Sequence, residues 1–215
     1  MTIGEVGFRA LLCGLVVGFA AVPAQGGEPS STNRLSNGEF DDADGVAGWS
    51  TLTPSFAALQ ADTEDSDLCP ASGTMRLSNS ELSTSSATAH FAFCTPNVTA
   101  GEVLRLSARF RFFPGTASSA TAVVYWYEEA VCSGFILDIQ STNTVLSVDA
   151  NWQEVVSSAL TVPATTHGAL VRIHLVKNDE EDPAAQMLVD RVRLAPQALL
   201  FAEDFEIGDP CRWSN

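Results

Sequence analysis

Leu104-Arg105-Leu106-Ser107-Ala108-Arg109-Phe110-Arg111-Phe112 alternates between apolar and polar side chains along its whole length. Successive side chains of a β-strand point to opposite faces of a sheet, so this pattern predicts a strand with one buried and one solvated face. Pro114-Gly115 then ends the strand with a turn signal.

Further stretches rich in β-branched and aromatic residues precede and follow this strand, separated by Gly, Pro, Asn, Asp and Ser. No long helical periodicity interrupts them. Many short strands at this spacing predict an all-β, antiparallel sandwich of two sheets. We expect the other strands at residues 55–61, 74–78, 88–93, 121–128, 135–140, 153–162, 169–177 and 186–194.

The two ends of the chain differ from this middle. Residues 1–24 have the form of an export signal, with Arg9 before an apolar run that is too short for a membrane span and with small residues at Val22-Pro23-Ala24. We therefore expect a secreted or periplasmic protein without membrane insertion; the alternative is that the apolar run is retained as an N-terminal anchor helix. Residues 25–34 are predicted to be a flexible lead-in, 35–196 the sandwich, and 197–215 a C-terminal strand or tag segment.

The charge balance limits the partners. Asp and Glu number 26 against 11 Lys and Arg, a formal net charge of −15. Nucleic acid and anionic membranes require positive surface, so neither is expected as a partner. The acidity is typical of a soluble exported protein, and we expect a monomer.

Four cysteines remain after the signal: Cys69, Cys94, Cys132 and Cys211. An even number in an exported chain predicts two disulfides, and none of the four has the spacing of metal ligands. Four cysteines allow three pairings, and spacing alone does not choose among them.

Several motifs together resemble the secreted bacterial jelly-roll domains of the galactose-binding-like, carbohydrate-binding-module type. The domain would open with Asn37-Gly38-Glu39-Phe40-Asp41 and Gly48-Trp49, and would close with Val189-Asp190-Arg191-Val192-Arg193-Leu194. Between them lie Tyr125-Trp126-Tyr127 followed by Cys132-Ser133-Gly134, and Trp152 followed by Val162-Pro163-Ala164 and Ala169-Leu170-Val171-Arg172-Ile173. The order and spacing of these segments imply a jelly-roll β-sandwich.

The resemblance also implies a disulfide. Two segments of the resemblance carry one cysteine each: the one with Cys132, and a further one in which Phe93-Cys94 is followed by Gly101-Glu102-Val103-Leu104. This implies a Cys94–Cys132 bridge between the edges of neighbouring strands. Cys69 and Cys211 would then pair and fasten the C-terminal segment to the sandwich. A Cys69–Cys94 bridge is the alternative.

Such jelly rolls often hold a structural calcium where the first and last strands meet. The matching positions here are Glu39, Asp41 and Asp190. Calcium takes six to eight hard oxygen ligands, and carboxylates from distant strands would join the sheet ends. In the alternative interpretation, the acidic residues around Asp41 form a solvated turn and Asp190 pairs with an arginine.

A glycan face requires aromatic plates and a few polar groups. Alternation places Trp126 in the core and turns Tyr125 and Tyr127 the other way, where Arg109 and Arg111 would complete a ligand face. The alternative is that the tyrosines pack and the arginines form a solvated face. We assign Trp49 and Trp152 to the core.

The chain has no motif of a serine hydrolase, zinc protease or P-loop. His174 lies in a predicted strand, where a histidine more often belongs to the solvated face or the core than acts as a base. We therefore expect no enzyme. The prediction is a non-catalytic secreted module that binds a carbohydrate or another surface ligand. The alternative is a structural or adhesion domain of the cell surface or matrix with a protein ligand. Exposed aromatics beside arginine or amide groups would favour the first.

Overall fold

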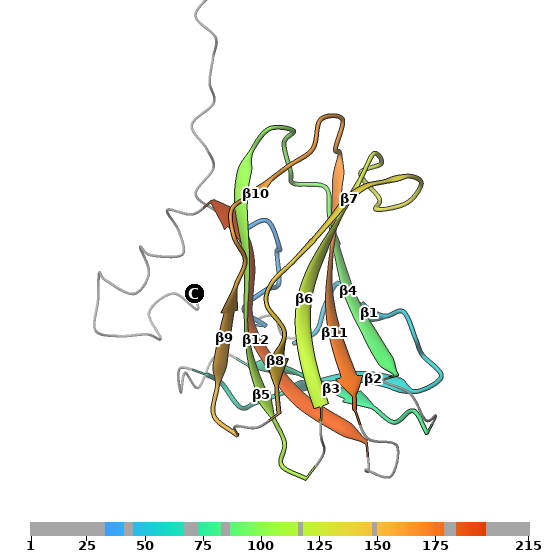
Figure 1. Ribbon diagram of the computed structural model, residues 1–215, viewed down its shortest axis with the longest axis vertical. Coiled ribbons are helices and arrows are strands. Elements are labelled where there is room, and N and C mark those ends of the chain that lie inside the picture. The colour runs from blue at the N-terminus through green and yellow to red at the C-terminus, as the bar shows by residue number, and fades with distance from the viewer. Residues whose placement is uncertain are drawn as a thin grey trace, which may run out of the picture.

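The computed structural model describes residues 33–40, 45–66, 73–82, 87–115, 118–147, 150–178 and 184–196. None of these residues lies in a helix, so none of the described segments could cross a membrane as an apolar helix. Their strands form two antiparallel sheets that face each other (Figure 1). The predicted all-β, antiparallel jelly-roll sandwich is confirmed.

The sheets, called A and B below, are built from strands far apart in sequence. Sheet A has the order β1 (Trp49–Thr51), β4 (Thr88–Thr95), β11 (Gly168–Lys177), β6 (Ser118–Tyr127) and β7 (Ile136–Ser141), with β8 (Val145–Leu146) also paired to β6. Sheet B has the order β10 (Leu160–Thr161), β5 (Val103–Phe112), β12 (Ala185–Pro196), β3 (Thr74–Asn79) and β2 (Ala57–Asp62), with β9 (Gln153–Val156) also paired to β5.

The core lies between the two sheets and follows from the alternation of their strands. The five apolar positions of β5, Leu104, Leu106, Ala108, Phe110 and Phe112, are all buried. Sheet A contributes alternate residues of β6 and β11, among them Trp126, which is fully buried as predicted. The indole Nε1 of Trp126 donates a hydrogen bond of 3.1 Å to Gln140 Oε1, so its polar atom is satisfied.

Each predicted strand overlaps an observed one, with two differences. The stretch 153–162 is divided into β9 and β10, because Ser157 leaves the ladder there. Its hydroxyl accepts a hydrogen bond from the Leu106 amide at 2.9 Å, and its own amide donates to the Leu106 carbonyl at 2.8 Å. The short strands β1 and β8 were not predicted, since two or three residues leave no periodicity to detect.

The segment 33–40 closes the sandwich against β12. The amide of Arg34 donates to the Leu194 carbonyl, and the amide of Val192 donates to the Gly38 carbonyl, both at 2.8 Å. Gly38 lies so close to β12 that a Cβ atom built on it would be 1.9 Å from the Val192 carbonyl oxygen. This approach requires glycine for its lack of a side chain.

We predict that Gly38→Ala lowers the free energy of unfolding by on the order of 3 kcal/mol, because the added methyl must push the segment away from β12. Urea denaturation would measure the change. The neighbouring exposed residue provides the control, and Ser36→Ala should alter stability by less than about 0.5 kcal/mol. An unchanged midpoint for Gly38→Ala would contradict the close approach.

Candidate functional site

The four residues predicted to share a ligand face lie on opposite sides of the molecule, and that prediction was wrong. Tyr125 and Tyr127 belong to β6 of sheet A, whereas Arg109 and Arg111 belong to β5 of sheet B. Both strands direct their apolar positions into the shared core, so their other side chains point away from each other. The sequence shows the alternation of each strand but not that the chain changes sheets between them.

The arginines of sheet B are already paired. Arg111 forms an ion pair with Glu64, and its guanidinium lies over the Trp152 ring at 5.5 Å from the centroid. Arg109 lies 3.9 Å from Glu154 and donates to the Ser66 hydroxyl at 3.2 Å. The assignment of Trp152 to the core was also wrong: it is half-buried against Arg111, whereas Trp49 is buried.

A second feature of sheet B is a shallow polar groove of about 220 Å³, lined by Ala58, Gln60, Arg76, Ser78 and Gln186. Arg76 donates to the Gln186 side chain at 2.7 Å and lies over the Phe113 ring at 4.6 Å. Its guanidinium is therefore held by groups of the protein itself. We regard this groove as a weaker candidate than the face described next.

Tyr127 is only 6% exposed and offers no ligand platform. It ends β6, and the loop that follows crosses neighbouring β11 so closely that a Cβ atom at Gly168 would be 2.4 Å from the Glu129 carbonyl oxygen. Gly168 is the cross-strand partner of Tyr127, so the loop covers this end of the sheet.

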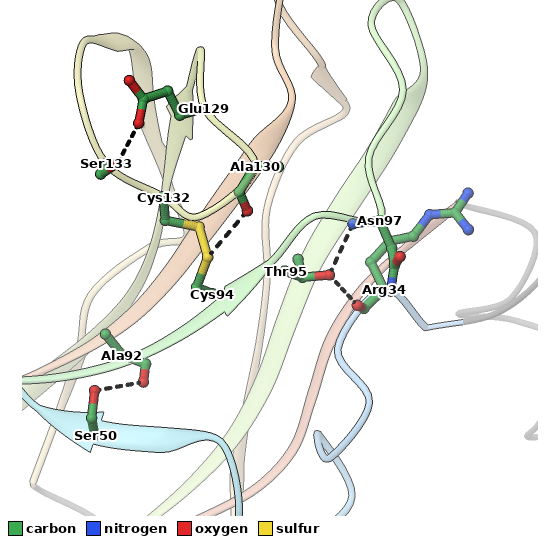
Figure 2. Close-up of a disulfide and its surroundings, with 10 residues drawn as sticks. All are labelled: Arg34, Ser50, Ala92, Cys94, Thr95, Asn97, Glu129, Ala130, Cys132 and Ser133. Carbon is green, nitrogen blue, oxygen red and sulfur yellow. Dashed lines mark hydrogen bonds between the residues drawn. A yellow bond between two sulfur atoms is a disulfide. The ribbon is translucent and has the colours of Figure 1, made fainter.

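A disulfide holds this loop in place. Cys94 of β4 is bonded to Cys132, which confirms the pairing implied by the resemblance and excludes a Cys69–Cys94 bridge (Figure 2). We had expected the bond to join neighbouring strands, and this part of the prediction was wrong. β11 lies between β4 and β6, so the bond from β4 to the loop after β6 spans β11. Cys69 and Cys211 lie outside the described residues, so their pairing stays a prediction.

The outer face of sheet A carries a cluster that the sequence did not reveal, formed by Tyr125, Arg172, His90 and His174. Arg172 lies with its guanidinium carbon 4.0 Å from the centroid of the Tyr125 ring. His90 of β4 and His174 of β11 are cross-strand partners whose rings meet edge to face at 4.5 Å. The four side chains form one continuous polar and aromatic patch across β4, β11 and β6.

Three nitrogen atoms of this cluster are buried and have no hydrogen-bond partner: Nδ1 of His90, Nε2 of His174 and Nε of Arg172. Buried polar atoms are nearly always satisfied in proteins, and an exception calls for an explanation such as a bound water, an ion or a functional role. Single atoms of this kind also occur at Arg34, Thr74, Arg105 and Thr166, but this cluster brings three together. The cluster is therefore the part of the described surface that is best suited to receive polar groups of a ligand.

The electrostatics of the cluster favour neutral imidazoles. Burial, with smaller contributions from His90 and Arg172, lowers the pKa of His174 to about 4. Burial and the Arg172 charge also lower the pKa of His90. At neutral pH Arg172 is then the one formal charge of the cluster, and each imidazole can donate one hydrogen bond and accept another.

Part of this cluster was detectable in the sequence. Leu170, Arg172, His174 and Val176 are the alternate, outward positions of the predicted strand 169–177. The pairing of His174 with His90 and the position of Arg172 over Tyr125 depend on register and on strand order, which a single sequence does not contain.

The predicted metal ligands do not converge as a set. Both carboxylate oxygens of Glu39 accept hydrogen bonds from Arg193, at 2.7 and 3.2 Å. Asp190 is buried and accepts from the amides of Ser66 and Arg191, whereas Asp41 lies outside the described residues. Burial raises the pKa of Asp190 to about 7, and the charge of Asp65 adds a smaller increase. The hydrogen bonds from Ser66 and Arg191 act in the opposite direction and lower this pKa. Within the described ranges, no three His, Cys, Asp or Glu side chains gather as a metal site.

Comparison with known proteins identifies the fold. No protein-family model and no curated protein matches the chain. A similar solved structure is the enzymatically active domain of tailspike protein 4 of bacteriophage CBA120, with a TM-score of 0.52 and 13% identity over 76% of this chain and 21% of that chain. The CBM22-1–GH10 modules of Clostridium thermocellum xylanase 10B, solved with xylohexaose, have a TM-score of 0.53 and 16% identity over 78% of this chain and 29% of that chain.

TmCBM61, solved with β-1,4-galactotriose, is similar over its entire length, with a TM-score of 0.53 and 13% identity over 78% of this chain. The chain spans about a fifth of the tailspike domain and less than a third of the xylanase. At these identities the similarity shows the fold alone, which is the β-sandwich of carbohydrate-binding modules.

The lowered pKa of His174 predicts a pH-dependent loss of stability. The unfolded chain, with a pKa near 6.5, binds a proton more readily than the folded one, so stability is complete above about pH 6.5 and falls as the pH approaches 4. When the pH falls from 7.5 to 4.5, the free energy of unfolding of His174→Gln should rise by about 2 kcal/mol relative to that of wild type. Urea denaturation at each pH measures this difference.

The variant is compared with wild type because Asp190 is present in both proteins. Its raised pKa makes its contribution to stability fall as the pH rises, opposite to that of His174, and the comparison cancels this contribution. The exposed His167 provides the matched control, because His167→Gln makes the same substitution outside the cluster. A difference between His174→Gln and wild type that does not change with pH would contradict the prediction.

Proposed function

We propose that this protein is a non-catalytic carbohydrate-binding module whose glycan binds on the outer face of sheet A. The observation that carries the proposal is the cluster of Tyr125, Arg172, His90 and His174, with three buried nitrogen atoms that lack partners. Sugar sites combine an aromatic surface with a few fixed polar groups, and this cluster provides both.

The geometry of the cluster is preorganised for binding. Each member projects from a strand in the middle of sheet A, so the backbone beneath it is fixed by pairing on both sides. The ring of Tyr125 holds Arg172, and the two imidazoles hold each other. Little side-chain entropy would be lost on binding, which favours affinity for small and weakly interacting ligands such as sugars.

The chemistry of the face supports binding without hydrolysis. Glycoside hydrolysis generally requires two carboxyl groups about 5 to 9.5 Å apart across the scissile bond. The outward residues that surround Arg172 on the described strands are Ala92, Cys94, Val123, Thr121 and Leu170, and none of them is acidic.

The comparisons support a carbohydrate ligand by analogy of fold. TmCBM61 and the xylanase modules of similar fold were solved with β-1,4-galactotriose and xylohexaose. The tailspike domain and the GH10 part are enzymes by name, but this chain spans a small part of each of those structures. We accordingly propose a binding role for the sandwich, in a monomer exported by the signal at residues 1–24 to the periplasm or the exterior.

The alternative function is a structural or adhesion domain that binds a protein. One observation favours it: apolar side chains are exposed in the loop between β6 and β7, with Val131 74% and Phe135 70% exposed, and in β7 itself, with Ile139 52% exposed. Apolar patches of this kind often mark protein interfaces. The outcome of glycan binding with variants of sheet A separates the two functions.

We also propose a structural calcium near Asp190. Asp190 and Asp65 are both buried, and the charge of Asp65 acts on Asp190. The carbonyl oxygens of Phe40 and Asp62 both approach Gly73, where a Cβ atom would lie 3.4 and 2.9 Å from them. Carboxylates and carbonyls are the oxygens that calcium prefers. Asp41 directly follows Phe40 and would complete the site, while Asp65 replaces Glu39, whose oxygens are bound to Arg193.

For the glycan site, Tyr125→Ala should weaken glycan binding by at least about tenfold, because Arg172 loses the ring that positions it. A glycan array followed by calorimetry on the best ligand would measure the effect. Trp152→Ala provides the control, since it removes an aromatic ring beside an arginine on the opposite sheet and should leave binding unchanged. An array without any signal, or full binding by Tyr125→Ala, would overturn the proposal.

For calcium, thermal melting should show a Tm about 5 °C higher in millimolar calcium than in EGTA, because a ligand that binds only the folded state stabilises it. Magnesium at the same concentration should produce a smaller shift, since it demands a stricter octahedral shell. Glu39→Gln should keep the calcium effect and Asp190→Asn should abolish it. Identical melting curves in calcium and EGTA would exclude the calcium.

A further inference from the structure

Arg172 differs from five of the seven other arginines that the structure describes, because those five form ion pairs. Ion pairs join Arg34 to Glu102, Arg76 to Asp62, Arg109 to Glu154, Arg111 to Glu64 and Arg193 to Glu39. No carboxylate of the described residues pairs with Arg172, although the chain has more than twice as many acidic as basic residues. A half-buried guanidinium charge to which the described residues offer no carboxylate is left to be stabilised by another anion.

The position of Arg172 leaves its hydrogen-bond donors available. The guanidinium contacts the face of the Tyr125 ring, and this contact uses the π surface and not the N–H groups. The five donors of a guanidinium lie in its plane and fit the two oxygens of a carboxylate. Its Nε is buried and has no partner, so the protein has withdrawn this donor from water without replacing the lost hydrogen bond.

The surroundings of Arg172 favour an anion over a neutral group. A charge withdrawn from water is stabilised well only by an opposite charge that also makes hydrogen bonds. The flanking side chains on β4 and β6, Ala92 and Val123, are small or apolar and cannot supply it. His174 and His90 have lowered pKa values, so at neutral pH they bring neutral hydrogen-bonding groups beside the charge of Arg172.

We propose that the ligand of this face is an acidic sugar, a uronic acid residue whose carboxylate pairs with Arg172 while its hydroxyls contact His90 and His174. This inference rests on the proposed glycan-binding function and specifies its ligand class. The carboxylate supplies the counter-ion that the described chain lacks, and the imidazoles exchange hydrogen bonds with the hydroxyls of the same ring. Tyr125 is a positioning residue, which acts by holding the guanidinium.

The net charge of −15 is compatible with such a ligand. Charges on the protein surface are screened over about 8 Å at physiological ionic strength, so distant carboxylates oppose a single bound uronate only weakly. They do oppose a long polyanion that would extend over the acidic surface. The site is therefore suited to isolated or terminal uronates on an otherwise neutral glycan.

The experiment uses matched pairs of oligosaccharides with the full chain. Each pair consists of an oligomer that contains galacturonate, glucuronate, mannuronate or guluronate and the same oligomer after reduction of its carboxyl groups to alcohols. Calorimetry at 0.15 M salt should find at least one acidic member that binds about tenfold or more tightly than its reduced partner. Sulfated oligomers without uronate form a separate arm, and a preference for them would overturn the carboxylate assignment.

Variants test the role of Arg172 itself. Arg172→Gln should abolish the preference for the acidic member and leave affinity for the reduced member within about twofold, whereas Arg172→Lys should retain part of the preference because it keeps the charge. Arg111→Gln makes the same substitution on the opposite sheet and should leave the preference intact. Melting curves confirm that the variants are folded, and the lysine variant still tests the proposal if the glutamine variant is not.

The outcomes distinguish the inference from the function on which it rests. If a neutral oligosaccharide binds as tightly as its acidic counterpart, or if Arg172→Gln keeps the preference, the acidic ligand class is wrong and glycan binding stands. If no oligosaccharide of either kind binds, both the function and the inference are overturned.

Discussion

The interior shared by the two sheets is the constraint on which the rest of the structure depends. Every strand of the middle of the sandwich gives alternate side chains to it, from Phe110 of β5 to Trp126 of β6 and Ile173 of β11. Burial of this apolar surface is the dominant favourable term in folding. It also fixes the remaining side chains, because a strand that shifted by one residue would exchange its buried set for its exposed set. The positions of Tyr125, Arg172 and His174 on the outer face therefore follow from the packing beneath them.

The fold could be predicted from the sequence to a large extent, and the site only in part. Alternation identified β5 and β11 almost to the residue, because each has one apolar face over its whole length. The resemblance implied the Cys94–Cys132 bond, which spacing alone did not determine. Local pattern contains no information on which sheet a strand joins, so Tyr125 was grouped with Arg109 from the opposite face. Trp152 was misassigned for a related reason: it directly precedes the short strand β9 at a sheet edge, where an aromatic ring can pack against an arginine outside the core.

The distribution of charge divides the molecule into two chemically different faces. On sheet B, the excess of acidic residues neutralises the basic ones, as in the pairs of Arg111 with Glu64 and Arg109 with Glu154. On sheet A the cluster has one cation, two imidazoles with lowered pKa values and an aromatic ring, and no described acid beside them. A prediction from net charge alone would describe the whole surface as acidic. The register of the strands shows a different local environment, because the residues that flank Arg172 on β4 and β6, Ala92 and Val123, are not acidic.

The disulfide has a mechanical consequence for this face. The Cys94–Cys132 bond connects β4 to the loop after β6, on the other side of β11, and the two cysteines are 38 residues apart in sequence (Figure 2). Antiparallel strands held by hydrogen bonds alone can slide under shear, but here β4 and the end of β6 are tethered over the strand between them. A pulling force applied to this surface would therefore be distributed over β4, β11 and β6 together.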